Sequence, residues 1–141
     1  MPDTDTPVAP AGAPVRSLSA AISNAVVALL HDYTGRGPTQ ARTTIGPDTI
    51  VVTLRESLTK AERTLAKRGQ ALEVLAMRRA FQGTMRDDMI AAIERLSGRS
   101  VEAFLSDNLY DPDVAVEIFL LHPQDGDGVR RSRAESVSAP D

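Results

Sequence analysis

Two glycines and several polar side chains are concentrated in one short stretch of the sequence. Glycine leaves backbone N–H groups accessible, threonine supplies a hydroxyl, and the planar guanidinium of arginine pairs with phosphates and carboxylates. The candidate anion-binding residues of this stretch are Thr34, Gly35, Arg36, Gly37, Thr39 and Arg42. Their spacing matches neither the phosphate loop Gly-x-x-x-x-Gly-Lys-Thr nor the dinucleotide motif Gly-x-Gly-x-x-Gly. A helix stop followed by a turn explains the same residues, so an anion site and a purely structural loop both stay open.

A second group of polar residues lies near the end of the sequence. Its members are Asp107, Asn108, Asp111 and Asp113. Their side-chain oxygens are ligands that a hard cation could use, but the alternating acids, central glycine and closing glutamate of an EF-hand are missing. Aspartate and asparagine are also the usual residues of hairpin turns. We therefore interpret the group as a polar site within a turn and predict no metal ion there.

The remaining residues give little support for catalysis. The chain has no cysteine, and its two histidines, His31 and His122, are accompanied by no further metal ligands at a recognisable spacing. Neither a Gly-x-Ser-x-Gly elbow nor a Ser-x-x-Lys motif is present. The sequence thus predicts no catalytic residue, no metal and no cofactor. The alternative is a small enzyme in which Arg36 and Arg42 hold an anionic substrate while Asp107 or Asp111 transfers protons.

The charges of the chain are separated along its length. Its 141 residues fit one domain with a formal net charge of −3. Between residues 36 and 99 there are twelve basic and seven acidic residues, whereas residues 100–121 contain five acids and no base. This pattern is typical either of a partner surface or of a basic helix beside an acidic hairpin. The net negative charge and the scarcity of aromatic residues argue against nucleic-acid binding.

Composition also indicates a compartment. No apolar run reaches the roughly 20 residues that a membrane-spanning helix needs. The first residues carry acids where a secretory signal would carry lysine or arginine. Together with the absence of cysteine, these features predict a cytoplasmic protein without a membrane span.

The periodicity of apolar residues predicts which elements hold these groups in place. Residues 1–16 and 123–141 are rich in Pro, Gly, Ser and Asp, so we expect a disordered arm and a disordered tail around a domain at 17–122. Helical spacing predicts a first helix that ends at Gly35. Thr59 and Glu62 form a capping box that starts a second helical stretch, which Gly69 breaks or bends and Gly98 ends. The outer face of this long helix is expected to carry Arg78, Arg79, Arg86, Asp87, Asp88, Glu94 and Arg95.

Strand patterns follow each helical stretch. The predicted hairpins join 41–45 to 49–54 and 101–106 to 113–121, the second through a turn at 107–112. Alternation places Arg42 and Thr44 on the opposite side of the first strand from its apolar residues. Both faces of the last strand carry apolar residues, which is typical of an interior strand or of one covered by another subunit.

The two halves of this pattern repeat. A helix, a Gly-Arg pair, a strand, a Pro-Asp pair and a second strand occur twice, with the Gly-Arg pairs 63 residues apart and the Pro-Asp pairs 65. Both dipeptides are also common at helix ends and turns, so coincidence is the competing explanation. A repeated helix–hairpin unit predicts an α+β fold of two layers (αββαββ), with a four-stranded antiparallel sheet and the helices on one face.

Several segments resemble the MpsC-like family of small bacterial domains, in the same order along the chain. The matching segments are 22–27, 33–43, 48–54, 58–62, 78–82, 105–108 and 111–117. The family takes its name from a component of a sodium-translocating, membrane-potential-generating system whose integral membrane partners are separate chains. The resemblance implies an accessory protein linked to membrane ion or inorganic-carbon transport, and it brings no catalytic residue with it.

These observations lead to a functional hypothesis. We expect a non-enzymatic cytoplasmic accessory or regulatory domain that binds a partner protein, such as a membrane transport complex, or a small anionic ligand. We also expect the chain to self-associate, as a homodimer.

Overall fold

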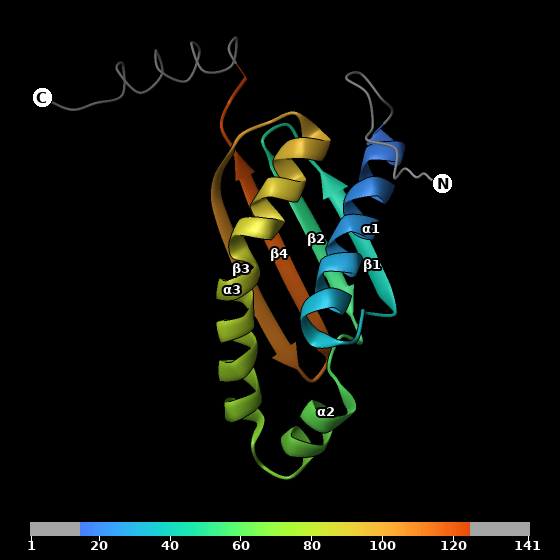
Figure 1. Ribbon diagram of the computed structural model, residues 1–141, viewed down its shortest axis with the longest axis vertical. Helices are drawn as coiled ribbons and strands as arrows, with labels where there is room; N and C mark the ends of the chain where they lie inside the picture. Colours follow the sequence, from blue (N-terminus) through green and yellow to red (C-terminus); the bar gives the residue numbers. More distant parts are fainter. Residues whose placement is uncertain (1–14, 125–141) are drawn as a thin grey trace, which may run out of the picture.

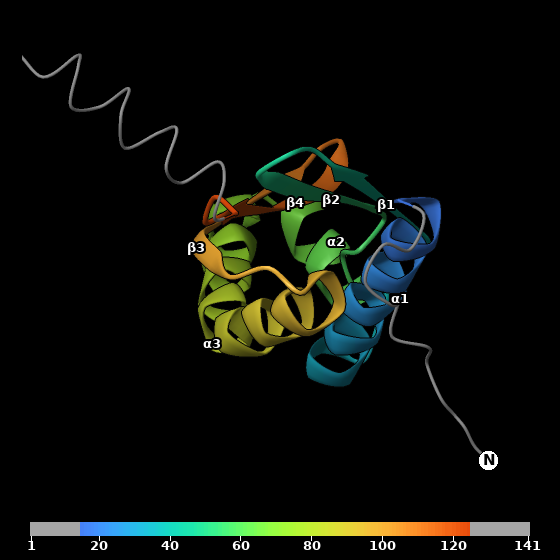
Figure 2. The same cartoon turned by 90° about the horizontal axis from the view of Figure 1, so that it is seen from above.

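The computed structural model describes residues 15–124, which form two helix–hairpin units and one short additional helix. The elements are α1 (Val15–Thr34), β1 (Gln40–Ile45), β2 (Thr49–Arg55), α2 (Lys60–Lys67), α3 (Ala71–Ser97), β3 (Val101–Tyr110) and β4 (Asp113–Leu121). The sheet order is β1-β2-β4-β3, and all neighbouring strands are antiparallel. α1 and α3 pack side by side on one face of this sheet, while α2 lies beyond its end (Figures 1 and 2). The predicted two-layer α+β fold is confirmed.

The core lies between the helices and the inward face of the sheet. α1 contributes Ile22 and Val26, and the central strands contribute Val52 and Phe119, all with no exposed surface. The Phe104 ring packs on Phe119 with 5.0 Å between their centroids. Burying side chains of this size stabilises the fold by about 1.5–3 kcal/mol each. The apolar residues that recur periodically in the sequence thus form the contact between the helix layer and the sheet.

The second helical stretch is divided at the predicted glycine. α2 ends at Lys67, Gly69 lies in the connection, and α3 begins at Ala71. At the start of α2, the Glu62 N–H donates to the Thr59 hydroxyl (3.1 Å) and the Thr59 N–H donates to the Glu62 carboxylate (2.7 Å). The capping box and the interruption are therefore both confirmed.

The capping box gives a first testable expectation. Thr59→Ala removes the acceptor for one N–H of the first turn of α2, and such losses cost about 1 kcal/mol. Urea denaturation should show this decrease in the free energy of unfolding. Thr64→Ala is the matched control, because the Thr64 hydroxyl only donates to Lys60 O one turn earlier in the same helix. An equal loss in both variants would contradict a specific role for the cap.

Two element boundaries differ from the expectation. β3 continues to Tyr110, so Asp107 and Asn108 belong to a strand and the turn contains only Asp111 and Pro112. The reason is that β4 offers paired backbone partners along the whole length of β3, and this ladder outweighs the turn preference of the two side chains. α1 begins at Val15, inside the expected arm. The rest of that arm and the tail from residue 125 lie outside the described residues.

The repeated unit has a structural counterpart. The N–H of Glu56 donates to Asp113 O (3.1 Å), and the N–H of Leu121 donates to Asp48 O (2.9 Å). These two bonds are equivalent, because Leu121 lies 65 positions after Glu56 and Asp113 lies 65 positions after Asp48. Val52 pairs with Glu117 at the centre of the β2–β4 ladder, again at this offset. The two helix–hairpin units are thus related by an approximate twofold axis through the middle of the sheet.

Candidate functional site

The loop after α1 begins as the end of that helix. The Gly35 N–H donates to His31 O (2.8 Å), with Gly35 at a φ of 77°. The Thr34 hydroxyl donates to Leu30 O (2.7 Å). Gly37 packs so closely on α1 that a Cβ there would lie 3.2 Å from the side chain of Val27. Thr34, Gly35 and Gly37 of the predicted anion loop therefore terminate the helix and fix the path of the chain.

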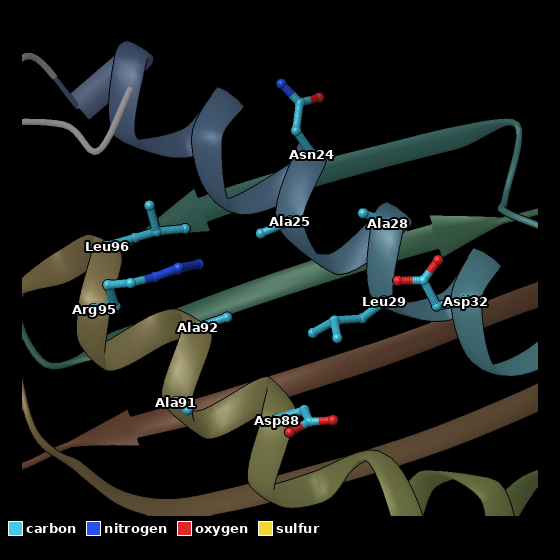
Figure 3. A pocket seen from close by; sticks show the side chains of 10 residues that line it. All are labelled: Asn24, Ala25, Ala28, Leu29, Asp32, Asp88, Ala91, Ala92, Arg95 and Leu96. Carbon is cyan, nitrogen blue, oxygen red and sulfur yellow. The ribbon is translucent and has the colours of Figure 1, made fainter. Parts of the chain in front are cut away.

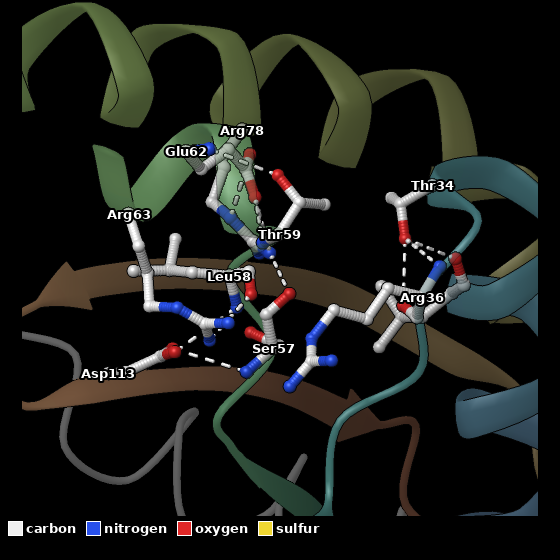
Figure 4. A network of polar contacts seen from close by, with 10 residues as sticks. Thr34, Arg36, Ser57, Leu58, Thr59, Glu62, Arg63, Arg78 and Asp113 are labelled. Carbon is white, nitrogen blue, oxygen red and sulfur yellow. Dashed lines mark hydrogen bonds and ion pairs between the residues drawn. The ribbon is translucent and has the colours of Figure 1, made fainter. Parts of the chain in front are cut away.

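The guanidinium of Arg36, in the same loop, points toward the segment before α2. Its Nη2 donates to Glu56 O (3.1 Å), and its Nε is buried with no hydrogen-bond partner among the described residues. Figure 4 shows the group between the loop and Ser57, with Asp113 beyond. A buried guanidinium N–H without an acceptor is costly, because its water has been removed and not replaced.

The twofold relation supplies an internal comparison for Arg36. Arg99 follows α3 as Arg36 follows α1, and the Ser97 hydroxyl accepts the Arg99 N–H (3.1 Å) as the Thr34 hydroxyl accepts the Arg36 N–H (3.3 Å). Yet the Arg99 guanidinium donates to Pro47 O (2.9 Å), to His122 O (2.8 Å) and to the Asp48 carboxylate (2.8 Å). The terminal nitrogens of Arg99 thus have three acceptors, whereas Arg36 donates to Glu56 O alone and its buried Nε has no acceptor among the described residues.

In the other helix–hairpin unit, the residue equivalent to Asp48 is Asp113, and its carboxylate does not bind Arg36. Its two carboxylate oxygens accept the N–H groups of Ser57 and Leu58, each at 3.2 Å. The Glu56 carboxylate accepts the hydroxyl of Thr39. The two nearby carboxylates, Glu56 and Asp113, therefore accept hydrogen bonds from other donors. Arg36 has no carboxylate partner equivalent to the one that Asp48 gives to Arg99.

Arg42 does not join Arg36. Thr43 faces α1, where its hydroxyl lies 2.7 Å from that of Ser23, so the neighbouring Arg42 points to the opposite face of the sheet, as alternation predicts. There Arg42 and Arg55 line a depression of about 630 Å³ whose lining does not include Arg36. One substrate held by both Arg36 and Arg42 thus gains no support from the structure.

The second predicted group of polar residues, near the end of the sequence, is also split between two separate places in the structure. Asp107 is exposed on β3, and its carboxylate accepts the N–H of Asn108 (2.8 Å). The Asn108 Oδ1 is buried without a partner in the described part of the chain. Asp111 and Asp113 line a separate cavity of about 290 Å³, together with Leu58, Arg63, Ala66, Lys67 and Tyr110. Within residues 15–124, no three His, Cys, Asp or Glu side chains are grouped so that they could hold a metal ion.

A buried polar cluster, which was not predicted, lies between α2, α3 and β4. Arg78 was expected on the outer face of its helix, but the side chain is buried. Its Nη2 donates to Ser57 O (2.6 Å), and its Nε lies 3.3 Å from Glu62 Oε2 as an ion pair without hydrogen-bond geometry. The prediction was wrong because Arg78 follows Val74 by four residues and so continues the buried row of α3.

Glu117 completes this cluster from the sheet. It is 2% exposed, and the Ser106 hydroxyl donates to it (2.5 Å). Burial raises the pKa of Glu117 to about 7, although hydrogen bonds from Ser106 and Gln82 and the charge of Arg78 oppose this effect. The cavity that the cluster lines measures about 10 Å³, at the lower limit of what one water molecule needs. The sequence contains one indication of this cluster: Glu117 is a single acid among the apolar residues 114–121 of the last strand.

The groove between α1 and α3 is lined mainly by small apolar side chains. It measures about 500 Å³, and its floor consists mainly of Ala25, Ala28, Ala91, Ala92 and Leu29. Figure 3 shows Asp32 and Asp88 toward one end and Arg95 toward the other. Tyr33 spans the helices and donates to Asp88 (2.7 Å). Two of its three charged lining residues are acids, so the groove is a less suitable anion site than the surroundings of Arg36.

The structure defines a small α+β domain in which the loop after α1 holds the buried, unpartnered Nε of Arg36, with no recognisable catalytic constellation among the described residues. A comparison with known families adds the assignment. Residues 15–123 match the family described as "Na+-translocating membrane potential-generating system (MpsC)", so the chain belongs to the MpsC family. Searches of curated proteins and of solved structures gave no match. None of the helices in residues 15–124 is both long and apolar enough to cross a membrane.

Proposed function

We propose that this chain is a non-enzymatic cytoplasmic accessory domain that binds a small anion through Arg36 and serves a membrane-potential-generating or ion-transport system. The link to such a system is supported by the description of the family. The single observation that carries the binding function is the contrast between Arg36, with a buried unpartnered Nε, and Arg99, with three acceptors.

The chemistry of the guanidinium decides the class of ligand. Nε and one terminal nitrogen of arginine present two parallel N–H groups, which fit the two oxygens of a carboxylate, bicarbonate or phosphate. At Arg99 the protein's own Asp48 occupies part of such a fork. At Arg36 the equivalent carboxylate is turned to Ser57 and Leu58. A small oxyanion that replaces the missing carboxylate would satisfy the buried donor.

The local charge is consistent with a small ligand of low charge. Arg63 lies on the α2 side of Asp113 and donates to Leu58 O (3.1 Å) (Figure 4). The carboxylates of Glu56 and Asp113 partly offset the two arginines, so a highly charged polyphosphate gains less here than a monoanion. We therefore rank bicarbonate and simple carboxylates above nucleotides as ligands.

Thermal unfolding in the presence of anions tests this proposal. Bicarbonate, acetate and phosphate are compared with chloride at equal ionic strength and pH. A ligand at ten times its Kd stabilises the folded chain by about 1.4 kcal/mol, which raises the Tm by roughly 5 °C. We expect such a rise with at least one of the three anions for the wild type, and its loss in Arg36→Ala.

Arg79→Ala is the matched control, because Arg79 is an exposed arginine of α3 outside the site. This variant should keep the full response to the anion. An anion that stabilises Arg36→Ala as much as the wild type would show that Arg36 is not its ligand. Absence of any stabilisation by the three anions would contradict the proposed binding function.

A further inference from the structure

The face of the sheet opposite the helices is uncovered in the part of the chain that the structure describes. Figure 2 shows α1 and α3 below the sheet and none of the described elements above it. The centre of this outer face is apolar, and its apolar residues are Val51, Ala103, Leu105, Leu109, Val114, Val116, Ile118 and Leu120. Leu105 and Leu109 are 54% and 57% exposed. Contiguous apolar surface of this kind marks an interaction site.

The register of the strands orders this outer face into rows. One row runs Thr44, Val51, Ile118, Leu105 across β1, β2, β4 and β3. The next row runs Arg42, Thr53, Val116, Asp107. In this second row a base stands at the β1 edge and an acid at the β3 edge, with uncharged side chains between them.

The charged ends of this row are available for contacts with another molecule. Arg42 and Asp107 are both exposed. Arg42 has no hydrogen bond or ion pair within the described residues, and the Asp107 carboxylate accepts only the N–H of the adjacent Asn108. Arg42 and Asp107 are separated by two strands, so they do not neutralise each other within one chain.

We propose that a second copy of this chain covers the outer face and that the two sheets form a sandwich with twofold symmetry. Aligned sheets pack about 10 Å apart with their strands within roughly 30° of each other. A twofold axis along the strands, between β2 and β4, places β3 of one copy over β1 of the other. Asp107 then meets Arg42 of the partner subunit in the same row, and this contact occurs twice.

The charge pattern distinguishes this arrangement from the other face-to-face dimer. A twofold axis across the strands, along the row that contains Arg42, would place β1 over β1 and bring Arg42 against Arg42 of the partner subunit. Like charges in contact disfavour that dimer. The face therefore complements itself in one orientation, which is why a second copy is the occupant that the observations favour over an unrelated protein.

The size of the face sets the expected strength of the dimer. Four strands 4.8 Å apart and about seven residues long present roughly 450 Å² of flat area per subunit. Side-chain relief increases this value, yet the interface stays near the lower end of specific ones. We therefore expect a dimer that forms and dissociates with concentration.

Sedimentation equilibrium from low micromolar to several hundred micromolar protein tests the proposal. The wild-type mass should rise from that of one chain to that of two. Arg42→Asp and Asp107→Arg should each raise the dissociation constant about tenfold or more, because each places like charges in two contacts. The double variant R42D/D107R restores opposite charges and should return the constant to near the wild-type value.

Two further variants separate the interface from general effects on folding. Leu105→Asp introduces a charge into the apolar part of the face and should also weaken the dimer at least tenfold. Arg79→Asp, the same charge reversal on the exposed side of α3, should leave the dissociation constant unchanged. Circular dichroism spectra identical to the wild type confirm that each variant is folded.

Four results would overturn the proposal. A wild-type chain that stays monomeric at all concentrations would mean that the face is covered by another segment of this chain or by a different protein. An Arg42→Asp variant that associates as tightly as the wild type would indicate the arrangement with β1 over β1, because there one pair of like charges only replaces another. A double variant no better than the single ones would show that the two residues do not meet. A dimer indifferent to Leu105→Asp would lie on another surface.

Discussion

Replacing Arg78 with methionine should reduce the free energy of unfolding by about 3–5 kcal/mol, the usual consequence of removing one member of a buried ion pair. Arg78 is 7% exposed and Glu62 is 5% exposed. Without Arg78, the Glu62 carboxylate remains buried with only part of its charge compensated, and Ser57 O loses its donor. Urea denaturation followed by circular dichroism measures the change.

Two comparison variants make this expectation specific. Arg79→Met alters the neighbouring, exposed arginine and should change the stability by no more than about 0.5 kcal/mol. Adding Glu62→Gln to Arg78→Met removes the uncompensated charge, so the double variant should recover part of the loss. Equal effects of the Arg78 and Arg79 substitutions would show that the buried pair has no special role in stability.

The second large effect is a dependence of stability on the protonation of Glu117. Burial raises the pKa of Glu117 from its ordinary value of 4.5 to about 7 in the folded chain. The folded state therefore holds a proton on Glu117 more tightly than the unfolded state does. This contribution to stability is complete below pH 4.5 and is lost as the pH rises through about 7. The difference in pKa corresponds to roughly 3 kcal/mol.

Glu117→Gln is the variant that reveals this contribution. The amide is neutral at every pH, so the variant should gain about 3 kcal/mol relative to the wild type between pH 4 and pH 8. Arg78 on α3 and Glu62 on α2 are the charged groups of the cluster and stay unchanged in this comparison. Glu102→Gln, at an exposed position of β3, should follow the wild-type curve. Parallel pH profiles for the wild type and Glu117→Gln would contradict a raised pKa.

The fold could be predicted from the sequence because its elements are local and strongly patterned. Helical spacing located α1 and α3, and the capping box located the start of α2. Alternation also predicted the outward direction of Arg42. These features depend on neighbours within a few residues. The repeated helix–hairpin unit predicted a four-stranded antiparallel sheet, but the order β1-β2-β4-β3 is known only from the structure.

The buried polar cluster could not be predicted in the same way. Arg78 and Glu62 are 16 residues apart, and Glu117 comes from the far end of the chain. Met77 is 41% exposed, while its polar neighbour Arg78 and Gln82, one turn further along α3, are buried. The amphipathic pattern of a helix predicts that an apolar residue such as Met77 is buried before a charged one such as Arg78. Only the tertiary structure shows that Arg78 finds a buried partner in Glu62.

The surroundings of Arg36 lie between these two cases. Gly35 marked the end of α1 in the sequence, and the structure has the C-terminus of the helix there. Arg36 lacks an acceptor because Asp113, which is 77 residues away in the chain, accepts hydrogen bonds from Ser57 and Leu58 in the segment before α2. The contrast between Arg36 and Arg99 depends on the twofold relation between the two helix–hairpin units, which the equivalent hydrogen bonds of the sheet establish.

The most direct measurement of the central claim is the NMR signal of the Arg36 Nε–H group during titration with bicarbonate, acetate or phosphate. Arginine labelled with nitrogen-15 makes these signals visible, and Arg36→Lys assigns the one that belongs to Arg36. We predict that the Arg36 signal shifts and saturates with at least one of these anions, while the signal of the exposed Arg79 stays in place. An Arg36 signal that does not move at anion concentrations that stabilise the protein would contradict the proposed binding site.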